Sequence, residues 1–461
     1  MGVLSLSPHA LFRLKISRLY IPRPTRHPTS MTALTDTELD SAKSAAAALN
    51  VAAKDMRVLS SLAWDNGMRD PFLKRGVMPN PEYASVDTSN AREAIASARG
   101  FIDGDHVVMA WLGRLCETLT TTANLMDTRG TPEFFTHSAA LYGQPTDFML
   151  DKTTRVLDLA RHMDATLDGM DFDQLVVEGY ETQLDAEGFA AALEEKLAPF
   201  FGEDAPQVIV SPDVSSKAAA SSKRIRVRSD AAFTDRDVDQ LLHHEALVHS
   251  ATGLNGKIQK NFPILGRGHP GTTEIQEGIA VFAEIITGNM DPRRFRRLSG
   301  RVLAIQMAID GADFKEVFDF FAGREGREQA YENTRRVFRG GVISGGAPFT
   351  KDMVYLNGLL RVHNFIRTAV KLRRSDLIRV LFVGKLDIED IPALAQLASQ
   401  NQIEPPKFMP PWASDLRFLV SYMAYSAFLN QVKMPGFQAY YERELDEVPD
   451  VWGFADGDPE T

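Results

Sequence analysis

The segment Leu241–His249 carries residue types that can bind a metal ion and use it. Within it His244 and His249 lie five positions apart, and Glu245 follows the first histidine directly. Imidazole nitrogens are common zinc ligands, and a neighbouring carboxylate can act as a general base on water. The segment therefore points to metal-assisted hydrolysis, with the two histidines as ligands and Glu245 as the base.

The histidine spacing departs from the familiar zinc peptidase pattern, in which the two histidines lie four residues apart on a helix. Here position four is Val248, which cannot bind a metal. A five-residue step on a regular α-helix turns about 140°, so the two rings would diverge. A wider turn with i→i+5 hydrogen bonds returns them to one side, and such turns concentrate at functional sites. We therefore expect a distorted helix between His244 and His249.

A catalytic zinc site usually has three protein ligands and one open position. Glu277, on a second predicted helix, is the best candidate for the third ligand. Glu274 lies one turn earlier on the same face and is the alternative ligand, or an acceptor for a ligand histidine. Two imidazoles and a carboxylate without thiolate suit zinc, with manganese and iron as alternatives.

A histidine–glutamate pair on a helix is often only part of a solvated face. Here, however, three of the 10 histidines fall within seven positions of an otherwise apolar segment. Together with Glu277, this clustering favours the metal site. We expect His243 to face elsewhere and to be structural, and His269 to be an ordinary loop residue.

The remaining sequence predicts a mainly α fold with a small antiparallel β-ribbon. Helical patterns dominate on both sides of two strand candidates, Gln207–Val210 and Lys223–Arg228, and an Ala- and Ser-rich segment joins the two. Thr234 is the expected cap of the helix that carries the histidines. The predicted regions are an extension (1–35), a helical region (36–200), a zinc-binding catalytic region (201–440) and an acidic tail (441–461).

The composition limits the classes of partner and the cellular location that we expect. Lys plus Arg is 51 and Asp plus Glu is 61, and the net charge of −10 argues against nucleic acid as the main partner. No apolar run reaches the length of a membrane span, so we expect a soluble protein without membrane contact. The single cysteine, Cys116, favours a reducing, cytoplasmic location. Residues 1–30 lack acids, which is typical of an unstructured extension, a true start at Met31, or an organelle transit segment.

The motifs resemble a known family, the microtubule-associated tyrosine carboxypeptidases, whose bacterial members are described as flavohemoglobin expression-modulating QEGLA-motif proteins. The last motif reads QEGIA here, with Ile279 in place of leucine. The similarity extends from about Leu39 to Met434 and rests on His244-Glu245-x-x-x-His249, Asn255-Gly256, Gln276–Ala280, Gly130–Phe134, Leu141–Gly143 and Phe349–Gly358.

This resemblance implies a zincin-like zinc carboxypeptidase with His244, His249 and Glu277 as ligands and Glu245 as catalytic base. The eukaryotic relatives remove the terminal tyrosine of α-tubulin. No residue pattern in this chain identifies a tubulin-binding surface, so that substrate is not carried over.

A carboxypeptidase must hold a terminal carboxylate, which favours a fixed cation near the metal. Arg339, Lys351 and Arg267 are candidates, although each can equally be an ordinary surface cation. Tyr355 is the candidate donor to the oxyanion, the alternative being a half-buried core tyrosine.

The strand candidate Lys223–Arg228 is basic and is a possible binding site for the peptide main chain. Its period-two pattern puts Ile225 and Val227 on one face and three arginines, Arg226 among them, on the other. An edge strand of this kind would pair with an extended peptide and attract acidic tails. The alternative is that the arginines only protect an exposed edge from aggregation.

The sequence thus predicts a zinc-dependent peptidase that acts on peptide or protein C-termini by metal-activated water. One alternative is a non-catalytic zinc-binding regulatory protein. Glu245 argues against it, because a structural site usually fills all four positions with protein ligands. A metal hydrolase of another amide or ester is the second alternative. The sequence does not give the oligomeric state.

Overall fold

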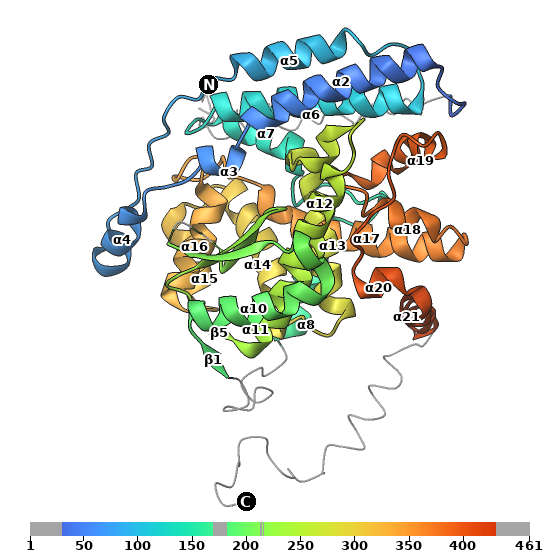
Figure 1. Cartoon of the computed structure of the whole chain (residues 1–461). Helices are drawn as coiled ribbons and strands as arrows, with labels where there is room; N and C mark the ends of the chain where they lie inside the picture. The colour runs from blue at the N-terminus through green and yellow to red at the C-terminus, as the bar shows by residue number, and fades with distance from the viewer. Residues whose placement is uncertain (1–29, 169–181, 213, 215, 430–461) are drawn as a thin grey trace, which may run out of the picture.

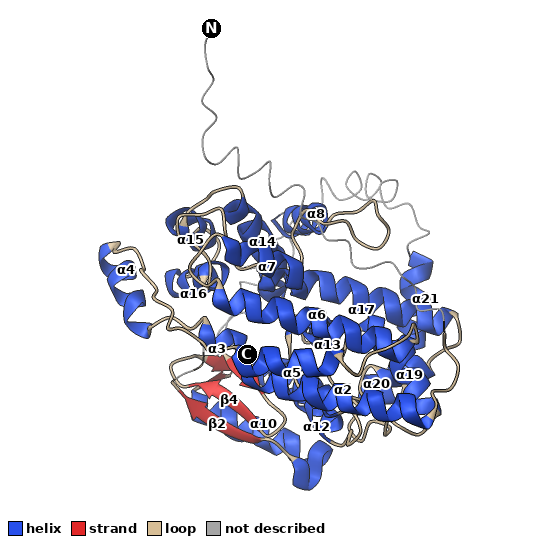
Figure 2. Cartoon of the chain, turned by 90° about the horizontal axis from the view of Figure 1, so that it is seen from above, coloured by secondary structure: helices blue, strands red, loops and turns tan. Residues whose placement is uncertain are grey.

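The computed structural model describes residues 30–168, 182–212, 214 and 216–429. Within these residues the fold is mainly helical with two small sheets, as predicted (Figures 1 and 2). Residues 1–29 of the expected extension and the whole expected acidic tail, 441–461, lie outside the described residues. None of the described helices is long and apolar enough to cross a membrane.

Helices from the first third of the chain form one side of the molecule, where α2, α5 and α6 run alongside one another (Figures 1 and 2). Helix α2 begins at a capping box in which Thr35 and Glu38 bond each other's backbone N–H groups. The helices are α2 (Asp36–Asp55), α3 (Val58–Ser61), α4 (Arg69–Arg75), α5 (Ser89–Arg99), α6 (Val107–Asp127), α7 (Glu133–Tyr142) and α8 (Val156–Asp168).

The rest of the chain supplies the helices that carry the candidate chemistry. Thr234 caps α11 as expected, in a capping box with Asp237. The elements are α10 (Ala186–Phe201), α11 (Asp235–Leu241), the π-helix η3 (Leu242–Ser250), α12 (Ala251–Lys257), α13 (Pro270–Ile286), α14 (Pro292–Ile309), α15 (Phe314–Ala322), α16 (Arg327–Phe338), α17 (Val354–Lys371), α18 (Asp376–Val380), α19 (Ile391–Ser399), α20 (Pro411–Ser414) and α21 (Leu416–Leu429).

The larger sheet differs from the predicted antiparallel ribbon. Its order is β2 (Gln207–Ser211), β4 (Arg224–Arg228) and β3 (Ala218–Ala220), and β2 pairs with β4 in parallel. The antiparallel partner of β4 is β3, which forms within the connecting Ala- and Ser-rich segment. The expected ribbon was wrong because this connection contains a strand of its own, which reverses the chain once more. A second sheet pairs β1 (Gln183–Leu184) with β5 (Phe233–Thr234).

The basic strand is consequently central and not an edge. Strand β4 is bonded to β2 on one side and to β3 on the other, so its backbone has no free edge for a peptide. The predicted facing is confirmed, since Ile225 and Val227 are fully buried, whereas Arg224 and Arg226 are exposed. The strand that keeps a free edge beside η3 is β3.

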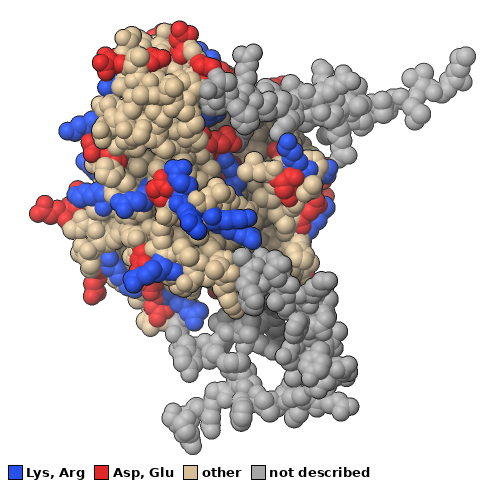
Figure 3. All heavy atoms as spheres, turned by 90° about the vertical axis from the view of Figure 1, so that its right-hand side faces the viewer, with Lys and Arg blue, Asp and Glu red and all other residues tan. Residues whose placement is uncertain are grey.

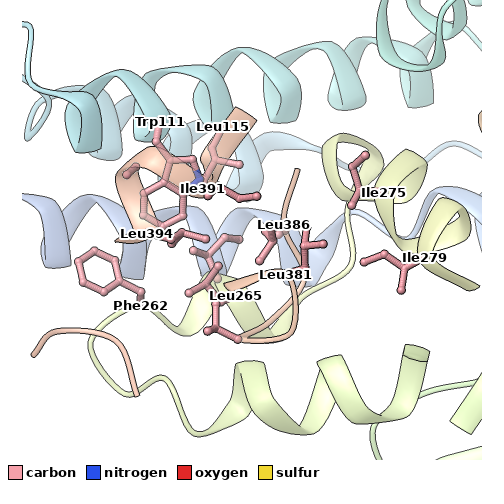
Figure 4. Close-up of a cluster of buried hydrophobic side chains, with 14 of the residues drawn as sticks. Trp111, Leu115, Phe262, Leu265, Ile275, Ile279, Leu381, Leu386, Ile391 and Leu394 are labelled. Atoms are coloured by element: carbon pink, nitrogen blue, oxygen red, sulfur yellow. The ribbon is translucent and has the colours of Figure 1, made fainter. Parts of the chain in front are cut away.

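The largest hydrophobic cluster joins helices from both halves of the chain. Trp111 of α6 stacks obliquely on Phe262, with ring centroids 5.8 Å apart, and Ile275 and Ile279 of α13 belong to the same cluster (Figure 4). Such buried side chains contribute roughly 1.5–3 kcal/mol each to folding. The core therefore fixes α13, which carries Glu277, against the first-third helices. The boundary at residue 200/201 stays a prediction.

Two glycines let α13 and α17 approach closely. A Cβ added to Gly278 would lie 2.4 Å from the carbonyl carbon and oxygen of Gly358, and a Cβ on Gly358 would lie 2.1 Å from the carbonyl oxygen of Glu274. Both distances are shorter than any real contact. Close helix contact thus brings Tyr355 on α17 beside Glu277 on α13, and it explains why the QEGIA segment has a glycine.

We predict that Gly278→Ala lowers the free energy of unfolding by about 2–4 kcal/mol, because backbone must move to admit the methyl group. Gly300→Ala is the matched control within a helix, since its Cβ would lie 3.8 Å from a Phe321 ring carbon. That change should raise stability by about 0.5–1 kcal/mol. Urea denaturation of both variants measures the difference, and equal effects would contradict this explanation.

Candidate metal centre

The two histidines lie on a π-helix, as the five-residue spacing predicted. Residues Leu242–Ser250 form η3, which follows α11 without a break and continues into α12. Val248, at the position where a four-residue spacing would put the second ligand, is fully buried in the main hydrophobic cluster. Ala246 and Leu247 pack into the cluster formed with α10 and the larger sheet. The widened helix is therefore held between two apolar clusters.

His244, His249 and Glu277 converge, with one ligand atom from each lying within 4.8 Å of the others. Glu277 Oε2 is 3.6 Å from Nε2 of each histidine. The imidazole centroids are 5.0 Å apart and the rings are nearly perpendicular. Two ring nitrogens and one carboxylate oxygen facing a common point fit the donor set of a divalent transition metal.

Glu277 uses its two carboxylate oxygens differently. Oε2 faces the histidines, while Oε1 accepts from Lys351 Nζ at 3.1 Å and from the Tyr355 hydroxyl at 3.2 Å. Burial raises the pKa of Glu277, but the positive charge of Lys351 and the neighbouring histidines outweigh burial and hold the pKa well below its ordinary value. The carboxylate is thus kept ionised and oriented toward the histidines.

A second carboxylate orients His244. The Nδ1–H group of His244 donates to Glu284 Oε1 at 2.5 Å, which leaves Nε2 free as a lone-pair donor toward Glu277 and His249. Arg294 donates to both oxygens of Glu284, at 2.6 Å for the Nη2–Oε1 contact. Burial raises the pKa of Glu284, yet the charge of Arg294 lowers it to about 2.

Sequence reasoning missed both Glu284 and Arg294, although one signal was present. Glu284 lies two helical turns after Glu277 on the same face, as an isolated acid in a long apolar stretch. The alternative assigned to Glu274 was wrong. Its side chain bonds Asn357 and Arg361 on α17, and the group that converges on one point contains Glu277.

Glu245 lies beside this group, next to strand β3 of the larger sheet. Its side chain is 9% exposed, and its Oε2 accepts from the backbone N–H of Ala220 at 2.9 Å. Ala220 belongs to β3, so this N–H points away from β4 and into the cavity that borders the histidines. One carboxylate oxygen is anchored by the strand, and the other is available to a reactant.

A large cleft of about 1400 Å³ is lined by the converging group together with Glu245, Lys351, Tyr355 and Arg294, whereas Glu284 is fully buried. Its lining includes 16 lysines and arginines but only six aspartates and glutamates, against a net charge of −10 for the whole chain. On the outer face shown in Figure 3, basic and acidic side chains lie among one another. Positive charge is thus concentrated in the cleft. Residues from α2 and α3 line it too, although the predicted catalytic region begins only at residue 201.

The predicted substrate cations all line this cleft, in different surroundings. Arg226 is exposed at the sheet, and Arg267 donates to Asn50 Oδ1 of α2 at 3.0 Å. Arg339 is buried over the Phe349 ring, and burial lowers its pKa to about 10. Lys351 is already ion-paired with Glu277. His243 lies outside the converging group, and His269 is buried just before the first residue of α13.

Comparison with known proteins identifies the family. The family model for microtubule-associated tyrosine carboxypeptidases matches residues 71–431. The chain belongs to this family.

Other comparisons add little. No curated protein matches the sequence. Among solved structures, a putative lipoprotein from Colwellia psychrerythraea is 15% identical, with a TM-score of 0.40. The match covers 73% of this chain and 66% of that one, just under two thirds of its length. A likeness this weak does not establish the fold class, so the expected zincin-like fold stays a prediction.

Asp352 is the buried acid around which the cations behind the centre are arranged. It is 2% exposed, accepts from Arg336 through both oxygens, and lies 3.6 Å from Arg301. Burial raises the pKa of Asp352, but the charges of Arg336 and Arg301 outweigh burial and hold it far below its ordinary value. Its contribution to stability is therefore present above about pH 4 and is lost as the pH falls toward the folded-state pKa.

We predict that Asp352→Asn lowers the free energy of unfolding at pH 7 by about 3–5 kcal/mol, because it leaves buried guanidinium groups unpaired. The difference from the parent should shrink as the pH falls from about 4 to 2. Chemical denaturation across this pH range measures both effects. Asp376→Asn is the control, since its pair with Arg374 is exposed and the change should leave stability nearly unaffected at every pH. A difference that is constant with pH would refute the assignment.

Proposed function

We propose that the chain is a zinc-dependent carboxypeptidase that cleaves near the C-termini of peptides or proteins. Family membership supports the general activity, and the convergence of His244, His249 and Glu277 beside Glu245 supports the metal and the mechanism. Zinc bound by these three side chains would supply Lewis-acid polarisation of the scissile carbonyl and a water with a lowered pKa.

Glu245 is the proposed general base. One oxygen is fixed by the N–H of Ala220, so the carboxylate has a defined direction and keeps the other oxygen for a proton. It would accept the proton of the attacking water and deliver it to the leaving amine. The low exposure of Glu245 limits competition from bulk water, which strengthens this transfer.

Tyr355 is the proposed donor to the oxyanion. Its hydroxyl lies 3.2 Å from Glu277 Oε1, and its ring has Lys351 Nζ at 5.0 Å and the Arg301 guanidinium at 5.1 Å from the centroid. These cations favour negative charge near the hydroxyl. A donor held beside the ligand carboxylate can therefore turn to a carbonyl oxygen that gains charge during attack.

The cleft favours an extended, acidic C-terminal segment. The outer edge of β3 lies beside Glu245, where the Ala220 N–H already bonds the Glu245 carboxylate, and the remaining backbone groups of this edge would pair with a peptide main chain. Basic side chains surround this path, including Arg226, Arg267 and Arg339. A cleft lined by one sign of charge raises the local concentration of oppositely charged substrate and its association rate.

Glu245→Gln is the direct test of this function. Hydrolysis of an acidic free-acid peptide by the zinc-loaded protein should fall about 10²–10⁴-fold, because the base is lost while size and shape stay similar. Zinc content should not change. Glu195→Gln, at an exposed position of α10, is the control and should keep full activity. Unchanged hydrolysis in Glu245→Gln would refute the mechanism.

Digestion of a peptide library and of model esters and amides by the zinc-loaded wild-type protein separates the two alternatives. A non-catalytic zinc-binding regulatory protein would bind zinc and cleave no member of a peptide library. A metal hydrolase of another amide or ester would leave the peptide library intact but cleave model esters or amides. Both outcomes are read by mass spectrometry of the digest.

Glu284 gives a test of the metal site that does not depend on turnover. Glu284→Ala should weaken zinc binding about 10–100-fold, because His244 loses the acceptor that fixes its ring. Competition with a chromophoric chelator measures this change. Glu274→Gln is the control and should leave zinc affinity as it is, since Glu274 faces α17. Equal effects of the two changes would argue against the ligand set.

A further inference from the structure

Lys385 is a half-buried cation beside the centre, close enough to Glu277 and Glu245 to feel their charge but hydrogen-bonded to neither. Its side chain lines the cleft, and among the described residues it forms no ion pair. The contact of its Nζ is with a neutral oxygen, Gln276 Oε1, at 3.3 Å. Burial lowers the pKa of Lys385 to about 8, against the opposing charges of Glu277 and Glu245. An ammonium group in this position would gain from an anionic partner.

Gln276 supplies a second unused donor at the same place. It precedes Glu277 on α13 and is 4% exposed. Its Oε1 accepts from the Thr252 hydroxyl at 2.7 Å, whereas its Nε2 is buried and has no partner within the described part of the chain. Buried amide donors are nearly always bonded, so an orphaned one lining a cleft marks a place for an acceptor.

Neighbouring residues fix the path of the Lys385 side chain. Its stem passes Gly253 on α12 and Gly268 in the loop before α13: Cβ atoms built on these glycines would lie 3.6 Å from Cε and 3.7 Å from Cδ. Larger side chains at these two positions would occupy the same space. The backbone N–H of Lys385 donates to the carbonyl of Leu265 at 2.7 Å, which anchors the residue at its other end.

The location matches the reach of a carboxypeptidase substrate. The terminal carboxylate lies one residue beyond the scissile carbonyl, about 4 Å along the chain. Its anchor must therefore adjoin the metal ligands, as Lys385 does through Gln276. Arg339 is less suitable, because its electrostatic neighbours are Arg335, Arg336, Asp352 and Tyr355, while those of Lys385 include Glu277 and Glu245.

We propose that Lys385 and Gln276 together bind the C-terminal carboxylate of the substrate. The ammonium group and the amide N–H would donate to the carboxylate oxygens, and Arg339 would be left to acidic residues elsewhere in the segment. This inference rests on the proposed function, since it assigns the residues that make the enzyme specific for chain ends. Both donors touch the substrate, so they are binding residues and not part of proton transfer.

The test measures binding, so that it does not depend on turnover. The full-length Glu245→Gln protein, loaded with zinc, is titrated with an acidic peptide of about six residues, once as the free acid and once as the C-terminal amide. Isothermal titration calorimetry should show the free acid binding about 10–100-fold more tightly. Adding Lys385→Met should reduce this preference to within about twofold, and adding Gln276→Met should reduce it partly.

Two matched variants serve as controls. Arg339→Met and Lys257→Met remove other cleft cations in the same way, and both should keep the preference for the free acid. Lys385→Met should fold, because it removes a charge that forms no ion pair with any residue the structure describes, and an unchanged thermal midpoint checks this. Lys385→Arg retains the charge and should keep part of the preference.

Three results would overturn the proposal: no preference in the parent, a preference that survives Lys385→Met, or a preference lost with Arg339→Met instead. Failure of the proposed function is recognised separately. If the wild-type protein cleaves neither peptide but the preference behaves as expected, the carboxylate site stands and the peptidase does not.

Discussion

The rest of the site depends on the widened turn of the helix between His244 and His249. A regular α-helix would send the two imidazoles apart, and no arrangement of neighbouring helices could correct that divergence. In the π-helix η3 both Nε2 atoms lie 3.6 Å from the same oxygen of Glu277. A π-helix carries a cost in hydrogen-bond geometry. Side chains of η3 pack into two apolar clusters, Val248 into one and Ala246 and Leu247 into the other, and this packing holds the helix in place.

Helix α13 adds the second constraint, because it carries a proposed ligand, an acid that orients His244 and a candidate binding residue. Glu277, Glu284 and Gln276 all project from it toward the histidines or the cleft. Its close contact with α17 at Gly278 and Gly358 brings Tyr355 within hydrogen-bond distance of Glu277. The QEGIA segment therefore combines packing and chemistry within five residues, which leaves little freedom for substitution.

The distorted helix was predictable from the sequence, because the five-residue spacing of His244 and His249 requires it, and Glu277 was predictable as the acid of a second helix that could complete their donor set. The sheet was not, since short strands of alanine and serine have weak propensity and the pairing of β3 with β4 is set by tertiary packing. This error turned the central strand β4 into a supposed edge. Glu284 was missed because its role depends on its hydrogen bond to His244, which lies 40 positions away in the sequence and meets Glu284 only in the folded chain. Lys385 comes from a loop more than 100 residues after Gln276, a pairing that only the folded chain creates.

X-ray diffraction from crystals of the purified protein, recorded at the zinc absorption edge, tests the central claim most directly. The account predicts a single strong anomalous peak per chain, about 2.0–2.2 Å from Nε2 of His244, from Nε2 of His249 and from a carboxylate oxygen of Glu277. No peak at this position in zinc-containing crystals, or a peak bound by other side chains, would contradict it.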